Sequence, residues 1–145
     1  MQNTRSLRTV LALALLLNLT WANLFSFAPG MTERLYRMPM TEGWHAYLAV
    51  SRGAAFFVLA IISLLALLRP RSFRSMTVVL LVAYFCFFLV DVIVLARGQM
   101  AFMVLLPEMI AYVFLSGALV RFYPAEEQES LRIPEKKVTG SSIEK

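Results

Sequence analysis

Long runs of hydrophobic residues, separated by short polar segments, form the main pattern along this 145-residue chain. The runs are about as long as the ~20 residues that an α-helix needs to cross the hydrocarbon core of a bilayer. This pattern predicts an all-α fold, an integral membrane four-helix bundle with a single transmembrane domain over residues 1–123. Its helices are expected at about residues 7–29, 42–68, 76–97 and 100–123. Residues 124–145 are polar and lack such a run, so we expect a disordered C-terminal tail.

The segment at residues 30–45 is the one sizeable connection between the predicted helices. Within it, Met31, Leu35 and Met38 recur at a helical spacing. We therefore expect one or two helical turns to lie on the membrane surface. Tyr36 should lie there at the boundary between lipid and water, where aromatic side chains with a polar tip are favoured.

The distribution of arginine and lysine predicts the topology. Ten of them fall on one side of the predicted bundle, in the N-terminal segment, the loop after the second helix and the C-terminal segment, and three fall in the segments on the other side. The ten are Arg5, Arg8, Arg69, Arg71, Arg74, Arg121, Arg132, Lys136, Lys137 and Lys145. By the positive-inside rule both termini are cytoplasmic. We expect a multi-pass protein of the bacterial cytoplasmic (inner) membrane.

Composition supports this class and excludes others. Hydrophobic residues make up 59% of the chain and charged residues 16%, whereas soluble domains are about half apolar and a quarter charged. The net charge of +5 comes largely from arginines that flank apolar runs, so we expect contact with the lipid bilayer and no nucleic-acid partner. Cys86 is the only cysteine, which excludes an internal disulfide, and we expect a small buried apolar side chain.

Three charged residues, Arg52, Asp91 and Glu108, lie inside the apolar runs. In the predicted topology each is roughly 8 to 12 Å below the outer face, at ~1.5 Å per residue. A charge at the centre of a membrane helix costs about 2.5 to 3.5 kcal/mol on insertion scales, so the three should face one another rather than lipid. We predict a polar layer in the outer half of the bundle.

Other polar residues are candidates for the same layer. Asn23 lies at a similar depth in the first helix and Asn18 about a turn and a half deeper, and both can hydrogen-bond across helices. His45 lies seven residues before the arginine and shares its helical face. Tyr112 lies one turn beyond the glutamate. The candidate ligand-binding or polar-layer residues are therefore Arg52, Asp91, Glu108, Asn18, Asn23, His45 and Tyr112.

The predicted layer is short of one positive charge, because it sets one arginine against two carboxylates. A proton on Glu108 or Asp91, a contribution from His45 or Arg97, or a bound cation would restore neutrality. We hypothesise that one of the two carboxyl groups is protonated or binds something. A structural ion pair that sets the register of the helices is the alternative, and both remain open.

The sequence also carries a family resemblance, over roughly residues 7–123. The features are four compact spans, the segment Ser51-Arg52-Gly53-Ala54-Ala55 near the start of the second helix, an arginine-rich loop before the third and a polar fourth helix. Together they resemble the DoxX-like group of small bacterial membrane proteins. That resemblance implies a four-helix membrane fold and, for some members, an accessory role in membrane redox complexes. One cysteine and one histidine cannot form a thiol pair or a bis-histidine haem site, so we expect no cofactor.

Three functional classes remain. The first is an accessory or interaction subunit, with a membrane protein partner or as a homo-oligomer, favoured by small size and slim helix faces. The second is a small proton-coupled transporter or ligand-binding protein, in which Arg52 meets an anionic group and a carboxylate carries a proton. The third is a membrane enzyme; it ranks last because the sequence contains no paired nucleophile and base and no metal-ligand spacing, and we assign no catalytic residue and no metal ligand.

Overall fold

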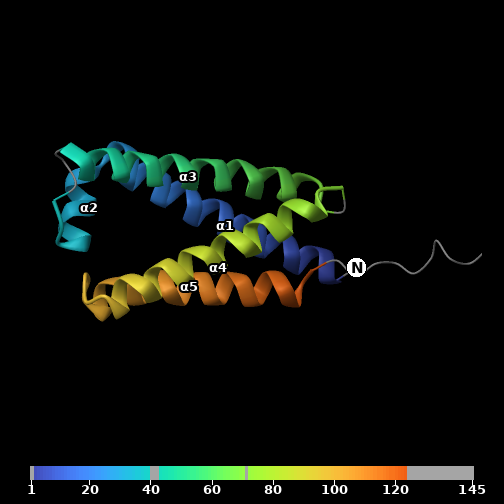
Figure 1. Cartoon of the computed structure of the whole chain (residues 1–145). Coiled ribbons are helices and arrows are strands. Elements are labelled where there is room, and N and C mark those ends of the chain that lie inside the picture. Colours follow the sequence, from blue (N-terminus) through green and yellow to red (C-terminus); the bar gives the residue numbers. More distant parts are fainter. Residues whose placement is uncertain (1, 40–42, 71, 124–145) are drawn as a thin grey trace, which may run out of the picture.

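The computed structural model of the chain describes residues 2–39, 43–70 and 72–123. Over these residues the regular structure is entirely helical. The helices are α1 (Gln2–Phe27), α2 (Pro29–Tyr36), α3 (Gly43–Leu68), α4 (Arg74–Ala96) and α5 (Phe102–Arg121) (Figure 1). Four of them, α1, α3, α4 and α5, are long and apolar enough to cross a membrane. The predicted all-α class with four membrane-length helices is confirmed, and the expected tail at residues 124–145 lies outside the described residues.

The long helices begin and end close to the predicted positions. The largest difference is in α1, which begins at Gln2 rather than near residue 7, because helical hydrogen bonding continues into polar residues that a hydropathy pattern does not count. α1 ends at Phe27, and Pro29 then occupies the first turn of α2. A proline is favoured there because its missing N–H would have no partner within the helix. The chain therefore turns between α1 and α2 within a few residues.

The most extensive contact in the bundle is between α1 and α3. Gly53 lies at this contact: a Cβ atom there would clash with Ser26 Oγ and lie 3.2 Å from the backbone oxygen of Ala22. Small residues let membrane helices approach closely enough for their backbones to touch. Gly53 therefore allows α3 to approach α1 closely at this point.

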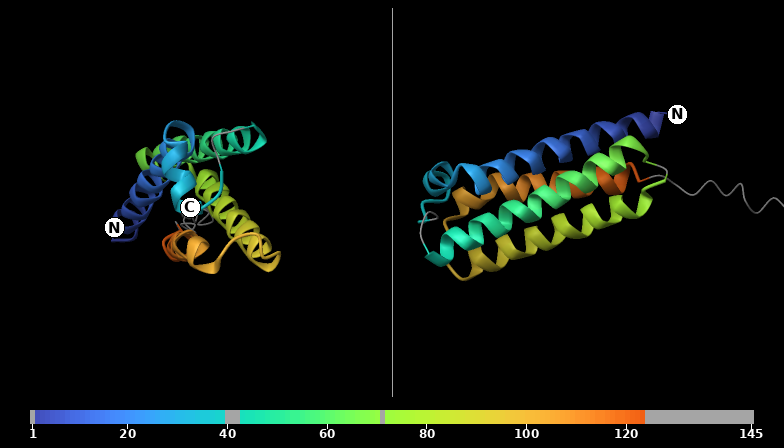
Figure 2. Two further views of the ribbon diagram at one scale, coloured as in Figure 1. Left: turned by 90° about the vertical axis from the view of Figure 1, so that its left-hand side faces the viewer. Right: turned by 90° about the horizontal axis from the view of Figure 1, so that it is seen from above.

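α4 and α5 form a second pair, and the two pairs diverge towards one end of the bundle (Figure 1). α2 lies across the opening between them at that end, as the end-on view in Figure 2 also shows. The described beginning of α1 and the end of α5 lie together at the opposite end. The bundle therefore has one end that is covered by α2 and an opposite end at which α1 begins and α5 ends.

The short helix α2 is the element that the spacing of Met31 and Leu35 predicts, but it presents a different face to the bundle. Met31 and Leu35 are exposed, whereas Thr32 and Tyr36 are buried. The Thr32 hydroxyl donates hydrogen bonds to the backbone oxygens of Leu24 (2.8 Å) and Ala28 (3.0 Å). Leu24 lies in the last turn of α1, so the first of these bonds ties α2 to α1. The Tyr36 ring adds contacts with Trp21 and Phe25 of the same helix.

α4 leaves much of its apolar surface outside the bundle. Val79, Val82, Phe85 and Leu89 are all exposed. Cys86 is also exposed, so the expectation that it is buried was wrong. Hydropathy cannot separate a lipid-facing position from a core position, because lipid chains are as apolar as a protein core.

Candidate functional site

The centre of the site is an ion pair between α3 and α5. The Arg52 guanidinium donates a hydrogen bond to Glu108 Oε2 at 2.8 Å. The Glu108 side chain is 2% exposed and the Arg52 side chain 29% exposed. The structure thus brings together two of the residues that the sequence places at one depth, and it leaves one side of the arginine accessible.

α2 contributes the third member of the site. The Tyr36 hydroxyl donates a hydrogen bond to Glu108 Oε1, so each carboxylate oxygen has its own donor. Sequence reasoning placed Tyr36 at the membrane boundary and missed this role. The available signal was the spacing of Thr32 and Tyr36, which are four residues apart and so share one helical face. That face is the one that α2 turns inward.

Aromatic rings surround the guanidinium. Its central carbon lies 4.8 Å from the ring centre of Phe25, 5.7 Å from that of Tyr36 and 5.8 Å from that of Phe56. An arginine near an aromatic face gains about 0.5–1 kcal/mol where the pair is exposed to water and about 2 kcal/mol where it is shielded, and the partly exposed Arg52 lies between these limits. The rings therefore hold the charge of Arg52 in position beside Glu108 without adding any charge of their own.

Asp91 on α4 and Tyr112 on α5 complete what we call the Arg52 cluster (Arg52, Glu108, Tyr36, Asp91 and Tyr112). Both lie within electrostatic reach of Arg52. Asp91 is 3% exposed and Tyr112 is fully buried. Within the described part of the chain, Asp91 Oδ2 has no hydrogen-bond partner, whereas the Tyr112 hydroxyl lies next to the Arg52 guanidinium and interacts with it. Buried polar atoms are paired in most structures, so this carboxyl oxygen is an exception that a bound proton or ligand would account for.

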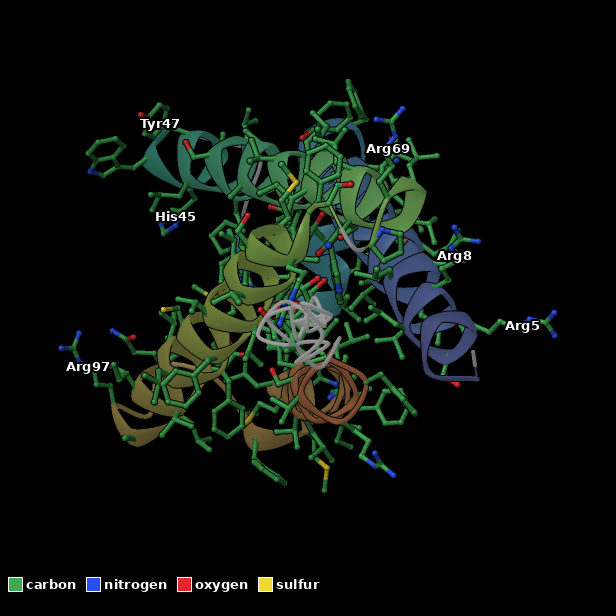
Figure 3. The ribbon with its side chains drawn as sticks, turned by 90° about the vertical axis from the view of Figure 1, so that its right-hand side faces the viewer. Arg5, Arg8, His45, Tyr47, Arg69 and Arg97 are labelled. Atoms are coloured by element: carbon green, nitrogen blue, oxygen red, sulfur yellow. The ribbon has the colours of Figure 1, made fainter. Side chains whose placement is uncertain are left out.

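The groups expected to supply a further positive charge lie elsewhere. His45 is exposed at the edge of the bundle, near the α2 end of α3, and Arg97 is exposed beyond the end of α4 (Figure 3). His45 and Arg52 lie on the same face of α3, but His45 lies near the start of the helix, beyond the packed part of the bundle. Sharing a helical face therefore does not bring the two side chains together. Among the described residues, the cluster contains one guanidinium and two carboxyl groups.

The two asparagines of α1 have different roles. Asn18 Nδ2 donates to Tyr84 Oη at 2.8 Å and to Ser63 Oγ at 3.2 Å, and the Ser63 hydroxyl donates to the Leu59 backbone oxygen at 2.8 Å. We call Asn18, Ser63 and Tyr84 the Asn18 cluster. It confirms that Asn18 hydrogen-bonds across helices. Asn23 does not: it is exposed and donates to the Leu19 oxygen of its own helix at 2.8 Å.

Among the described residues, no three histidine, cysteine, aspartate or glutamate side chains come together. No protein-family model matches the chain, and neither does a curated protein or a solved structure. The resemblance to DoxX-like proteins therefore stays a prediction, and function has to be inferred from the geometry. Chemically, the Arg52 cluster offers a guanidinium with one accessible side and two carboxyl groups able to hold protons.

Proposed function

We propose that this chain is a multi-pass protein of the bacterial cytoplasmic membrane that binds a proton in the Arg52 cluster and couples it to the binding of a small anionic ligand. The observation that carries the proposal is the buried, unpartnered carboxylate oxygen of Asp91, beside an arginine that already pairs with Glu108. Because of this observation, we rank a ligand-binding protein ahead of the accessory subunit that the sequence favours.

The charge balance supports a proton as one of the bound species. An isolated ionised carboxylate is expensive to bury, and it becomes neutral instead when no counter-charge is available. Arg52 uses its 2.8 Å hydrogen bond on Glu108. A proton on Asp91 makes the resting cluster neutral, with the ionised Glu108 balanced by Arg52.

The accessible side of Arg52 supports an anionic ligand. If Glu108 takes up a second proton, its hold on the guanidinium weakens, and Arg52 can pair with an anion instead, since guanidinium groups suit carboxylate and phosphate geometry. The cluster is neutral before and after this exchange. Tyr36 covers Glu108 from α2, so entry from the α2 end requires this helix to shift.

Proton uptake during ligand binding tests the coupling. The purified protein in weakly buffered detergent is titrated with small monocarboxylates and with inorganic phosphate, while a pH indicator records proton uptake. We expect one anion to bind with uptake of one proton. Glu108→Gln should still bind the anion but take up no proton, and Arg52→Gln should not bind it. Binding without proton uptake in the unmodified protein, or no binding of any anion, contradicts the proposal.

Cysteine labelling tests the proposed orientation. In a Cys86→Ala background, Arg34→Cys on exposed α2 should react with a membrane-impermeant maleimide in intact cells, after the outer membrane is permeabilised. Ser72→Cys, in the loop between α3 and α4, should react only when the inner membrane is opened. The reverse pattern would mean that the α2 end faces the cytoplasm.

An accessory subunit is the second candidate, and the exposed apolar face of α4 favours it. Purification in mild detergent separates the two candidates. A stoichiometric membrane protein partner, lost when Phe85→Ala alters the exposed face of α4 and retained in Val113→Ala on α5, would favour the accessory function. A monomer without a partner would count against it.

A further inference from the structure

A groove of about 610 Å³ runs between α1 and α5. It lies at the end of the bundle opposite α2, where α1 begins and α5 finishes (Figure 1). No residue of the Arg52 cluster lines it. Whatever fills the groove is therefore a different ligand from the one that reaches Arg52.

The groove is polar at one end and apolar along the rest. Its polar end is formed by the exposed side chain of Arg121 and the hydroxyl-bearing residues Ser6 and Thr9. Towards mid-bundle it is lined by Leu13, Val113 and Phe114, large apolar side chains that are 47%, 57% and 63% exposed. The stretch of α5 from Val113 to Arg121 is ~12 Å long at 1.5 Å per residue, close to one leaflet of a ~30 Å hydrocarbon core.

We propose that this groove binds one anionic phospholipid, with its phosphate at Arg121 and one acyl chain along Leu13, Val113 and Phe114. The proposal rests on the membrane insertion proposed above and not on the chemistry of the Arg52 cluster. Arginine donates paired hydrogen bonds to phosphate. Basic sites between membrane helices on the cytoplasmic side bind anionic head groups, and Arg121 lies at the end that the positive-inside rule makes cytoplasmic.

The lining of the groove suits an acyl chain, because it is apolar and its floor contains a small residue. Gly117 also lines the groove, and a Cβ atom there would meet nothing within 4 Å. A flexible acyl chain can lie in this open space.

Native mass spectrometry of the protein released from a mixed bilayer of phosphatidylglycerol and phosphatidylethanolamine tests the proposal. We expect one phosphatidylglycerol to stay bound per chain, in preference to phosphatidylethanolamine. Arg121→Gln should lower that retention about fivefold, since one arginine near the membrane surface contributes about 1 kcal/mol to anionic lipid binding. Arg97→Gln, an exposed arginine at the other end, should leave retention unchanged.

Filling the groove gives an independent test. Gly117→Leu places a side chain in the open space and should abolish retention of the bound lipid, whereas Gly117→Ala adds one methyl group and should keep most of it. Retention of phosphatidylethanolamine at the same level, unchanged retention in both Arg121→Gln and Gly117→Leu, or a second copy of the chain in place of the lipid would each overturn the proposal.

Discussion

The Arg52 cluster and the Asn18 cluster both bury polar groups among helices that could cross a membrane, but they do so in different ways. In the Asn18 cluster, neutral side chains from α1, α3 and α4 share hydrogen bonds of 2.8 and 3.2 Å. In the Arg52 cluster, charged side chains from α3 and α5 pair at 2.8 Å, and a second carboxyl group remains beside them. The Asn18 cluster contains no charged group, whereas the Arg52 cluster contains two carboxyl groups and one guanidinium.

This difference indicates which cluster can change state. Hydrogen bonds between neutral groups in membranes contribute about 0.6 kcal/mol on average and do not depend on a titrating group. A buried ion pair is strongly destabilised when one partner is lost, because the remaining charge is uncompensated. We therefore assign helix register to the Asn18 cluster and proton exchange to the Arg52 cluster.

Removing the arginine should have the largest effect. Arg52→Leu leaves Glu108 buried without its counter-ion, and we expect a loss of about 3–5 kcal/mol in the free energy of unfolding, measured by denaturant titration in detergent. The double variant Arg52→Leu with Glu108→Leu should recover most of this loss. If the single variant is as stable as the unmodified protein, the pair does not hold the bundle together.

Removing Asn18, the central residue of the Asn18 cluster, should lower the free energy of unfolding by less. Asn18→Leu deletes two hydrogen bonds and deprives the buried Tyr84 hydroxyl of its donor, while Ser63 keeps its bond to the Leu59 oxygen, so we expect a loss of about 1–3 kcal/mol. The loss should be the same at mildly acidic and neutral pH, whereas the loss in Arg52→Leu should shrink at acidic pH, because a protonated Glu108 needs no counter-ion. A strong pH dependence for Asn18→Leu would erase the distinction between the two clusters.

Removing the hydroxyl by which Tyr36 of α2 bonds Glu108 should lower the free energy of unfolding by less still. Tyr36→Phe keeps the ring, whose centre lies 5.6 Å from that of Phe25, and removes the hydrogen bond to Glu108. We expect a loss of about 1 kcal/mol together with faster hydrogen exchange of α2 amides. Tyr47→Phe, exposed on α3, is the matched control and should change neither quantity. Unchanged exchange in Tyr36→Phe would show that the tyrosine does not fasten α2.

Neutralising the second acid should have the smallest effect on stability. If Asp91 carries a proton at rest, Asp91→Asn replaces one neutral group by another of similar shape, and the free energy of unfolding should change by less than about 1 kcal/mol. The same denaturant titration measures it. A loss comparable to that of Arg52→Leu would mean that Asp91 is ionised and that Arg52 depends on it.

The sequence was sufficient to predict the membrane-length helices and the convergence of Arg52 and Glu108. Length and hydropathy determine the first, and the cost of a charge in hydrocarbon determines the second. The same reasoning placed Asn18 in the outer layer, whereas its partners lie in a separate cluster. Depth along a helix does not reveal how the helices cross, and the crossing decides which residues meet.

The role of Tyr36 and the positions of His45 and Cys86 could not be predicted for related reasons. Tyr36 reaches Glu108 because α2 folds back over the opening between the helix pairs, which is a tertiary contact. His45 shares a face with Arg52 but lies at the edge of the bundle. Cys86 sits in an apolar run whose outward side is as hydrophobic as its inward side. Local sequence fixes the face of a helix, and only packing decides what that face meets.

Infrared difference spectroscopy of the carboxyl groups tests the central claim most directly. The purified protein in lipid is titrated with pH, and the C=O stretching band of a protonated carboxyl is assigned by comparison with Asp91→Asn and Glu108→Gln. We predict a protonated carboxyl band at neutral pH that is absent in Asp91→Asn and present in Glu108→Gln. If both carboxyl groups are ionised at neutral pH and gain protons only in the acidic range of exposed acids, the Arg52 cluster does not hold a proton and the proposed function is wrong.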